Sequence, residues 1–167
     1  MHTRRLVASL AARALIAASI LAWLPQPSGA AGGVLAAAAD LAGDAGQMRR
    51  SRLPLLVLYS QAGCSWCEKL RREYLEPMQR DPAYRDRVLL RQVDIDSTGP
   101  LADFSGRSTT HAEFARREGV RFTPTVVVYG PDGRRLAEPI VGVGVADLYG
   151  AYLDQAIERA LSRLRQP

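Results

Sequence analysis

The stretch "YSQAGCSWCEKLRREYLEPM", residues 59–78, is the most informative part of the 167-residue chain and holds its only two cysteines, Cys64 and Cys67. It overlaps the end of an uninterrupted apolar run, residues 55–59, which is typical of a strand buried on both faces. Beyond the cysteines, apolar residues recur at helical spacing, which predicts a helix from Cys64 to Gln79 that Pro77 can kink or end. Cys64 therefore stands where a buried strand gives way to a helix N-terminus.

The segments that follow predict a sheet with parallel strands. Residues 88–94 form a second strand candidate, and two strands joined through a helix make a parallel β-α-β unit. Residues 97–109 are polar and show no period, so a long loop is expected there. A second helix is predicted to begin at Thr110, where Thr110 and Glu113 have the spacing of a capping box, and to end at Gly119.

The last third of the chain predicts a hairpin and a helix. Residues 125–129 and 134–141 have strand character and flank the turn sequence of residues 130–133. From about residue 145 to residue 164 the apolar positions, Leu148 included, repeat at helical spacing. The expected fold is therefore an α/β domain over residues 53–167, with a central mixed sheet, a C-terminal β-hairpin and flanking helices.

The front of the chain has the pattern of a secretory signal peptide, residues 1–30. A basic start with Arg4 and Arg5 leads into an apolar stretch, residues 14–24, and then into the small residues 28–30. The alternative, an uncleaved membrane anchor, is opposed by the length of the apolar stretch, which is below the roughly 20 residues of a spanning helix. Cleavage after Ala30 and export to the periplasm are expected, and the sequence leaves Sec and twin-arginine export both open.

Residues 31–52 form a lead-in segment, either a short amphipathic helix or a loose approach to the domain. Cleavage after Ala30 would remove three of the 22 basic side chains and none of the 17 acidic ones, so the formal net charge falls from +5 to +2. No cluster of interleaved arginines and aromatic residues remains in the mature chain. A nucleic-acid partner is therefore not expected.

The two cysteines have the position of a redox pair. A helix N-terminus stabilises negative charge, which lowers the pKa of Cys64 and favours its thiolate, and Cys67 lies one turn away on the same face. Cys64 would then attack a partner's disulfide and Cys67 would resolve the mixed disulfide, with no cofactor. A structural staple is the plain alternative, but so small a ring contributes only about 2 kcal/mol in the chain-entropy model.

Metal and haem sites have less support. A zinc site needs four ligands, and His111 is the only other soft ligand of the mature chain. Covalent haem would need a histidine after Cys67, where the chain has Glu68.

From residue 53 to about residue 164, the chain resembles the thioredoxin superfamily, and within it the exported thioredoxin-related proteins of the SoxW type. The resemblance rests on "CSWC" after the apolar strand, on "VRFTPT" at residues 120–125, on "VVVYGPDGRRL" and on Gly142 before the last helix. It implies a cis peptide bond between Thr123 and Pro124, and it places the backbone of Thr123 beside Cys64 to pair with a substrate strand.

Three positions depart from thioredoxin itself. Leu58 stands where thioredoxin has a buried aspartate, Gly63 replaces the tryptophan before the motif, and Ser65-Trp66 replaces Gly-Pro. Glu68 is a candidate proton relay for Cys67, or merely a solvated ion-pair partner of nearby arginines. Trp66 is a candidate platform for partner recognition, or packs on a neighbouring loop as part of the core.

With the signal peptide, a periplasmic thiol-disulfide oxidoreductase that acts as a monomer is expected, and the resemblance favours a reductase of disulfides in exported proteins. Its electrons would come from a membrane transporter of the DsbD or CcdA kind. A disulfide oxidase or isomerase is one alternative, and a thioredoxin-fold protein that only binds a partner or Cu(I) is another. The direction of the reaction depends on the reduction potential of the Cys64/Cys67 pair.

Overall fold

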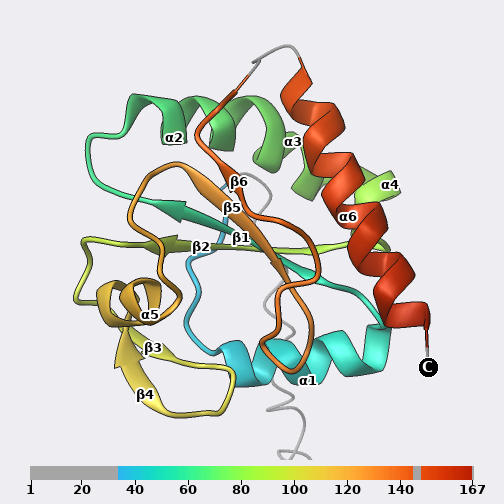
Figure 1. Cartoon of the computed structure of the whole chain (residues 1–167), viewed down its shortest axis with the longest axis horizontal. Helices are drawn as coiled ribbons and strands as arrows, with labels where there is room; N and C mark the ends of the chain where they lie inside the picture. The colour runs from blue at the N-terminus through green and yellow to red at the C-terminus, as the bar shows by residue number, and fades with distance from the viewer. Residues whose placement is uncertain (1–33, 145–147, 167) are drawn as a thin grey trace, which may run out of the picture. The chain divides into compact units, whose positions relative to one another are not determined.

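The computed structural model describes residues 34–144 and 148–166, so the predicted signal peptide, residues 1–30, lies outside the described residues. Its centre is a mixed four-stranded sheet with the order β2-β1-β5-β6 (Figure 1). The strands are β1 (Leu55–Ser60), β2 (Leu89–Asp94), β5 (Thr125–Tyr129) and β6 (Ile140–Val141). β1 runs parallel to β2 and antiparallel to β5, and β6 runs antiparallel to β5. The predicted α/β architecture with a mixed sheet is confirmed.

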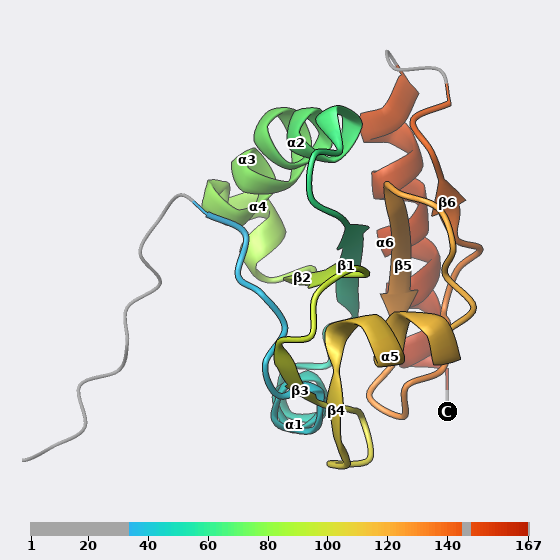
Figure 2. The same cartoon turned by 90° about the vertical axis from the view of Figure 1, so that its left-hand side faces the viewer.

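Helices cover both faces of this sheet, and Figure 2 shows them on either side of β1 and β5. Because successive side chains of a strand point to opposite faces, Leu56 and Leu58 join one buried cluster while Leu55, Val57 and Tyr59 join the other. The first cluster is completed by α2 (Ser65–Leu70), a π-helical turn (Arg71–Leu75), α3 (Glu76–Arg80) and α6 (Tyr149–Arg165). The second is completed by α1 (Leu41–Ser51) and α5 (His111–Arg117), and the short helix α4 (Pro82–Arg85) leads into β2.

The helix that follows the cysteines continues through Pro77 instead of ending there. The N–H of Glu76 bonds to the carbonyl of Arg71, five residues back, which defines the π-helical turn before α3. Proline has no N–H and collides with the carbonyl four residues back in a regular helix. The wider π-helical turn next to Pro77 is where the chain accommodates it, so the helical path extends to Arg80.

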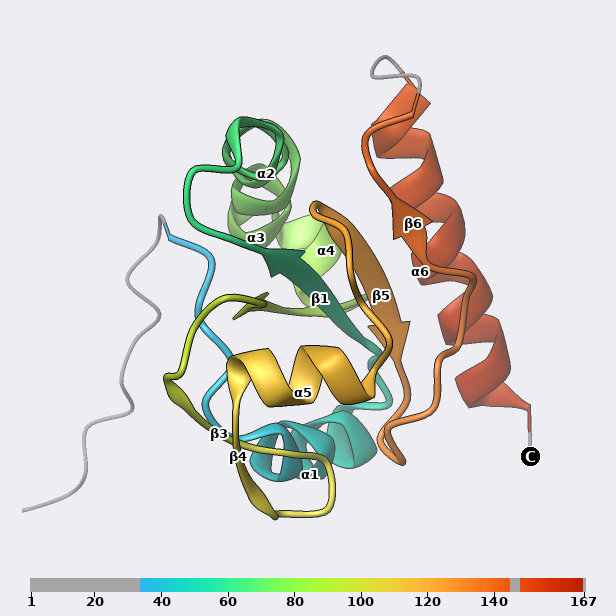
Figure 3. The ribbon, with the colours of Figure 1, turned by 60° about the vertical axis from the view of Figure 1, so that its left-hand side comes forward.

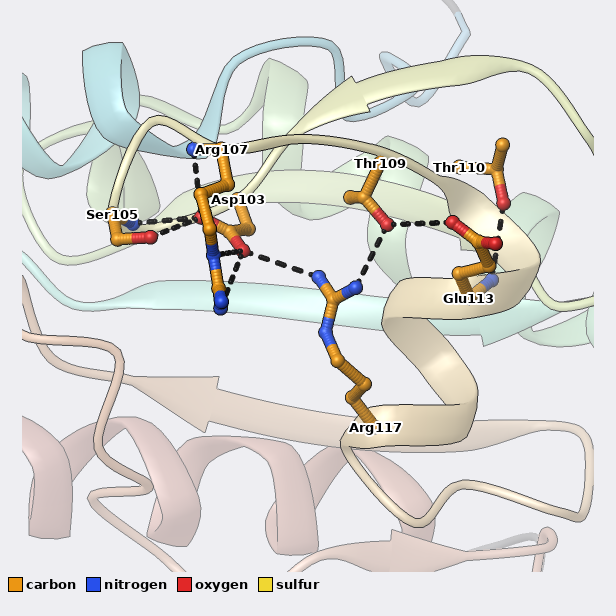
Figure 4. Close-up of polar contacts among 7 residues, drawn as sticks. All are labelled: Asp103, Ser105, Arg107, Thr109, Thr110, Glu113 and Arg117. Atoms are coloured by element: carbon orange, nitrogen blue, oxygen red, sulfur yellow. Dashed lines mark hydrogen bonds and ion pairs between the residues drawn. The ribbon is translucent and has the colours of Figure 1, made fainter.

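The prediction of an irregular loop at residues 97–109 was wrong. This segment contains two antiparallel strands, β3 (Pro100–Ala102) and β4 (Ser108–Thr110). The buried carboxylate of Asp103 organises the turn between them: it accepts hydrogen bonds from the backbone N–H groups of Ser105 and Arg107, at 3.0 and 3.1 Å, and from the hydroxyl of Ser105 at 2.6 Å. Arg117 of α5 donates to the same carboxylate at 3.1 Å, which ties the hairpin to the helix (Figure 4).

The helix predicted at Thr110 is α5, and half of its capping box forms. The hydroxyl of Thr110 accepts from the backbone N–H of Glu113 at 3.2 Å, as predicted for an N-cap. The carboxylate of Glu113 accepts instead from the hydroxyl of Thr109 at 3.2 Å, a contact that Figure 4 also draws.

The C-terminal hairpin is shorter than the predicted strand of residues 134–141. Only Ile140 and Val141 pair with β5 as a strand, together with an isolated bridge from Arg135 to Tyr129. Pro139 lacks the N–H that a continuous ladder needs, which fits the interruption between these two points. In the last helix, residues 145–147 of the predicted span lie outside the described residues, and Leu148, which was expected to face the core, is exposed.

The lead-in segment is part of the folded unit. Residues 36–38 pair with Gln92 at the outer edge of β2, where Ala38 donates to the Gln92 carbonyl at 2.8 Å and Gln92 donates to the Ala36 carbonyl at 2.9 Å. The helix of this segment is α1, which begins at Leu41 and so takes up only the second half of residues 31–52. Within residues 34–144 and 148–166, no helix is long and apolar enough to span a bilayer.

Candidate active site

Cys64 and Cys67 form a disulfide at the carboxyl end of β1, at the first turn of α2. Their Cα atoms lie 5.2 Å apart. Cys64 is the N-cap residue of α2, and its Sγ accepts a hydrogen bond from the backbone N–H of Cys67 at 3.1 Å. When the disulfide is reduced, the same N–H and the helix dipole would stabilise a thiolate at Cys64.

The two sulfurs differ in access to solvent. Cys67 is buried, with 1% of its surface exposed, whereas Cys64 is partly exposed. An incoming disulfide can therefore reach Cys64 first, and Cys67 becomes relevant only once the partner is attached.

The loop between β1 and α2 gives Cys64 this position. Gly63 adopts φ +70°, a left-handed conformation that glycine takes without strain, and an added Cβ there would meet no atom within 4 Å. The tryptophan that thioredoxin has at this place is thus replaced by a residue that leaves the approach to Cys64 open.

The Thr123–Pro124 segment lies at the same end of the sheet. Thr125, the first residue of β5, pairs with Tyr59 near the end of β1, so the residues before β5 and those after β1 meet at one edge. The peptide bond between Thr123 and Pro124 is cis, as the resemblance implied. Phe122, just before it, is 71% exposed, and its carbonyl accepts from the hydroxyl of Thr125 at 2.8 Å.

Trp66 and Glu68 both lie on the surface of α2. Half of Trp66 is exposed, so the alternative in which it packs into the core is wrong, and the Nζ of Lys69 lies 5.5 Å from the centre of its ring. Glu68 is exposed and forms an ion pair with Arg71, which also donates to the side chain of Gln92 at 3.2 Å. This ion pair with Arg71 is the contact expected if Glu68 is a solvated partner of nearby arginines. A proton-relay role for Glu68 stays a prediction.

Leu58 is fully buried in the cluster that also contains Leu70, on the face of the sheet that α2 covers. This position supplies no carboxylate beneath the redox pair. In the part of the chain that the structure describes, no three His, Cys, Asp or Glu side chains come together in an arrangement that could hold a metal ion.

One neighbour of the site was not predicted from the sequence. Asp96 follows β2, and its Oδ2 accepts a hydrogen bond from the backbone N–H of Ala62 at 2.9 Å. It lines a cleft of about 410 Å³ that also includes Gly63, Glu68 and Arg71. The available signal was topological: β1 and β2 are parallel, so residues that follow them meet at the same edge.

The chain is similar to a known protein family over most of its length. A model of the thioredoxin-like domain matches residues 42–157, more than half of the chain. The chain belongs to this thioredoxin-like family. With its C-x-x-C pair joined as a disulfide on a thioredoxin fold, it is a thiol-disulfide oxidoreductase. No curated protein matches the sequence.

The chain is also similar to solved thioredoxins, at low sequence identity. The oxidised mitochondrial thioredoxin 3 of Saccharomyces cerevisiae is 18% identical, with a TM-score of 0.50 over 74% of this chain and 93% of that one. A thioredoxin of Malassezia sympodialis is 19% identical, with a TM-score of 0.49 over 78% and 92% of the two chains. Thioredoxin O2 of Arabidopsis thaliana in its oxidised state is 20% identical, with a TM-score of 0.47 over 73% and 93%.

Proposed function

We propose that this thioredoxin-like protein is a periplasmic reductase of disulfides in exported proteins, with Cys64 as the nucleophile and Cys67 as the resolving thiol. The observation that carries the proposal is the unequal pair: a partly exposed Cys64 at a helix N-terminus and a buried Cys67 one turn further on. The signal-peptide pattern of residues 1–30 supports export to a compartment where disulfides form.

The proposed reaction transfers two electrons from the cysteine pair to the substrate disulfide, with no other reactant. The Cys64 thiolate attacks one sulfur of the substrate disulfide, so a Cys64–substrate bond forms, the substrate bond breaks, and the first substrate thiolate leaves and takes up a proton. Cys67 then loses its proton and attacks the Cys64 sulfur, which releases the second substrate thiolate. The substrate gains two electrons, and the protein is left with the Cys64–Cys67 disulfide seen in the structure.

Recognition of the substrate is assigned to the surface around Cys64. Trp66, between the two cysteines, and Phe122, just before the Thr123–Pro124 bond, are large exposed side chains. An extended substrate segment would pair with the backbone of Thr123 while its apolar side chains contact these rings. Main-chain pairing accepts many sequences, which suits an enzyme with several exported protein substrates.

The oxidised pair must be reduced again by another dithiol. A membrane transporter of the DsbD or CcdA kind is the proposed electron donor, and the protein is proposed to act as a monomer without a cofactor. The same surface that receives a substrate disulfide would receive the reduced donor, because both steps run through a mixed disulfide at Cys64.

Trapping tests the exchange reaction. The Cys67→Ala variant, expressed in the periplasm, should accumulate mixed disulfides between Cys64 and exported proteins, visible as adducts that a reducing agent removes. The Cys64→Ala/Cys67→Ala double variant is the matched control and should show none. A protein that merely binds a partner or Cu(I) would form no such adducts, and that result would refute the proposal.

The equilibrium between the Cys64/Cys67 pair and a glutathione buffer tests the direction. A reductase should have a reduction potential near that of thioredoxin, about −270 mV, or below it. A value near about −120 mV, typical of the strong periplasmic oxidant, would show a disulfide oxidase instead.

A further inference from the structure

Asp96 reaches across from one strand end to the loop that carries the nucleophile. It lies in the turn after β2, and its Oδ2 accepts the backbone N–H of Ala62 at 2.9 Å. Ala62 stands two residues before Cys64, in the middle of the loop between β1 and α2. A carboxylate that accepts an N–H forms a charge-assisted hydrogen bond, about twice as strong as a neutral one.

The loop has little else to hold it. Residues 61–63 are exposed, and the N–H of Cys64 bonds within the loop to the carbonyl of Gln61 at a long 3.4 Å. Gly63 is in a left-handed conformation with open space around it. Among the described residues, Asp96 is the one hydrogen-bonding partner outside the loop that residues 61–63 have.

The turn that carries Asp96 is itself well anchored. The N–H of Ile95 bonds to the carbonyl of Ser60 at 2.8 Å, and the N–H of Ser97 closes the turn on the carbonyl of Asp94 at 3.0 Å. Helix α5 adds a third tie, since the N–H of Ala112 bonds to the carbonyl of Ser97 at 2.9 Å.

A buried histidine also holds the chain at the start of this turn. The Nδ1 of His111 accepts the backbone N–H of Asp94 at 3.1 Å, so Nε2 carries the proton and donates to the carbonyl of Ala38 at 2.8 Å. Asp96 therefore projects from a segment fixed by β1, by α5 and by the lead-in segment. The loosely held loop before Cys64 is thus attached to a well-anchored residue. Figure 3 shows α5 beside the chain that follows β2.

We propose that Asp96 is a positioning residue for Cys64: by holding the N–H of Ala62, it keeps Cys64 at the N-cap of α2, where the helix stabilises the thiolate. The proposal rests on the proposed role of Cys64 as the nucleophile. Asp96 does not touch the reacting sulfur and acts through the loop. Its own negative charge would oppose a nearby thiolate, so its benefit comes from holding the loop in place and not from a direct electrostatic effect on the sulfur.

The rate of Cys64 alkylation, measured as a function of pH, separates the effect of the Asp96 hydrogen bond from the effect of the Asp96 charge. In the Cys67→Ala background, the Asp96→Ala variant should raise the pKa of the Cys64 thiol and slow its alkylation near neutral pH by about tenfold. Asp96→Asn keeps an oxygen that can accept from Ala62 and loses the charge, so its alkylation rate should stay within about twofold of the parent protein.

The matched control is Asp94→Asn, which removes a carboxylate from the same cleft without touching Ala62. Its pH profile should remain close to that of the parent. The proposal is wrong if Asp96→Ala leaves the profile unchanged or makes Cys64 more reactive, or if Asp96→Asn is impaired as much as Asp96→Ala.

A second measurement does not depend on how the variants fold. In the unaltered protein, the Ala62 amide should exchange its hydrogen at least about tenfold more slowly than an unstructured amide, although its residue is exposed. Exchange at the rate of a free loop would overturn the proposal. Neither measurement uses a protein substrate, so a failure here is distinct from a failure to trap mixed disulfides with Cys67→Ala.

Discussion

The hydroxyl groups of Tyr59 on β1 and Tyr129 on β5 lie 2.6 Å apart in the buried cluster between the sheet and helices α1 and α5. Tyr129 donates its proton to the carboxylate of Glu118 at 2.9 Å, so Tyr59 is the donor to Tyr129. Burial raises the pKa of both phenols, which keeps them protonated. The two strands beside the redox pair are thus joined by side chains as well as by their backbone ladder.

Removing the Tyr129 hydroxyl should lower the free energy of unfolding more than removing the Tyr59 hydroxyl. Tyr129→Phe leaves both the Tyr59 hydroxyl and the Glu118 carboxylate without this partner and should cost about 2 to 3 kcal/mol. Tyr59→Phe leaves the bond from Tyr129 to Glu118 intact and should cost about 1 kcal/mol. Urea denaturation of the oxidised protein measures both, with Tyr152→Phe as a surface control. A larger loss for Tyr59→Phe would contradict the donor order.

The unequal exposure of the two cysteines should appear as unequal reactivity. In the reduced protein, iodoacetamide should modify Cys64 at least about tenfold faster than Cys67, because Cys67 is buried and Cys64 lies at the helix N-terminus. Mass spectrometry of peptides after short labelling times gives both rates. In denaturant the rates should converge, and equal rates in the folded protein would contradict the assigned roles.

Asp103 should make stability depend on pH. Hydrogen bonds from Ser105, with further bonds from Arg107, lower the pKa of this carboxyl below its ordinary value despite its burial. A lowered pKa in the folded state means that the stabilisation is complete above the unfolded pKa of about 3.9 and is lost as the pH falls through the folded pKa.

The Asp103→Asn variant tests this loss of stability at low pH. It should be less stable than the parent protein by about 2 kcal/mol at neutral pH, where the ionised carboxylate holds Arg117 and the β3–β4 turn. The difference should shrink as the pH falls below about 4. A difference that is constant over the whole range in thermal unfolding would argue that the charge of Asp103 has no part in it.

Leu58→Asp would place a carboxylate where thioredoxin has one. Leu58 is fully buried among apolar residues in this protein, so the variant should lose at least about 3 kcal/mol of stability at neutral pH. Burial would raise the folded-state pKa of the new carboxyl, so the loss should be smaller near pH 4, where it is neutral, and should grow as the pH rises. Leu58→Met, which conserves volume, should cost less than about 1.5 kcal/mol.

Several features of the fold followed from local patterns. The apolar run before the cysteines predicted a buried strand, and β1 is buried along its whole length. Spacing and capping residues predicted the helix at Thr110 and the main body of the last helix. At residues 97–109 the local pattern failed because a contact with a later helix contributes: the segment shows no period, yet Asp103 and Arg117 organise part of it into a hairpin.

The C-x-x-C pair of Cys64 and Cys67, the buried strand before it and the helix after it could all be read from the chain, because these features depend on neighbours a few positions away. The burial of Cys67, the exposure of Trp66 and the hydrogen bond from the loop before Cys64 to Asp96 became apparent only from the folded chain. These properties arise where parallel strands end at a common edge and where helices pack on a sheet. Residues more than 30 positions apart meet there, and no local pattern of the chain encodes that meeting.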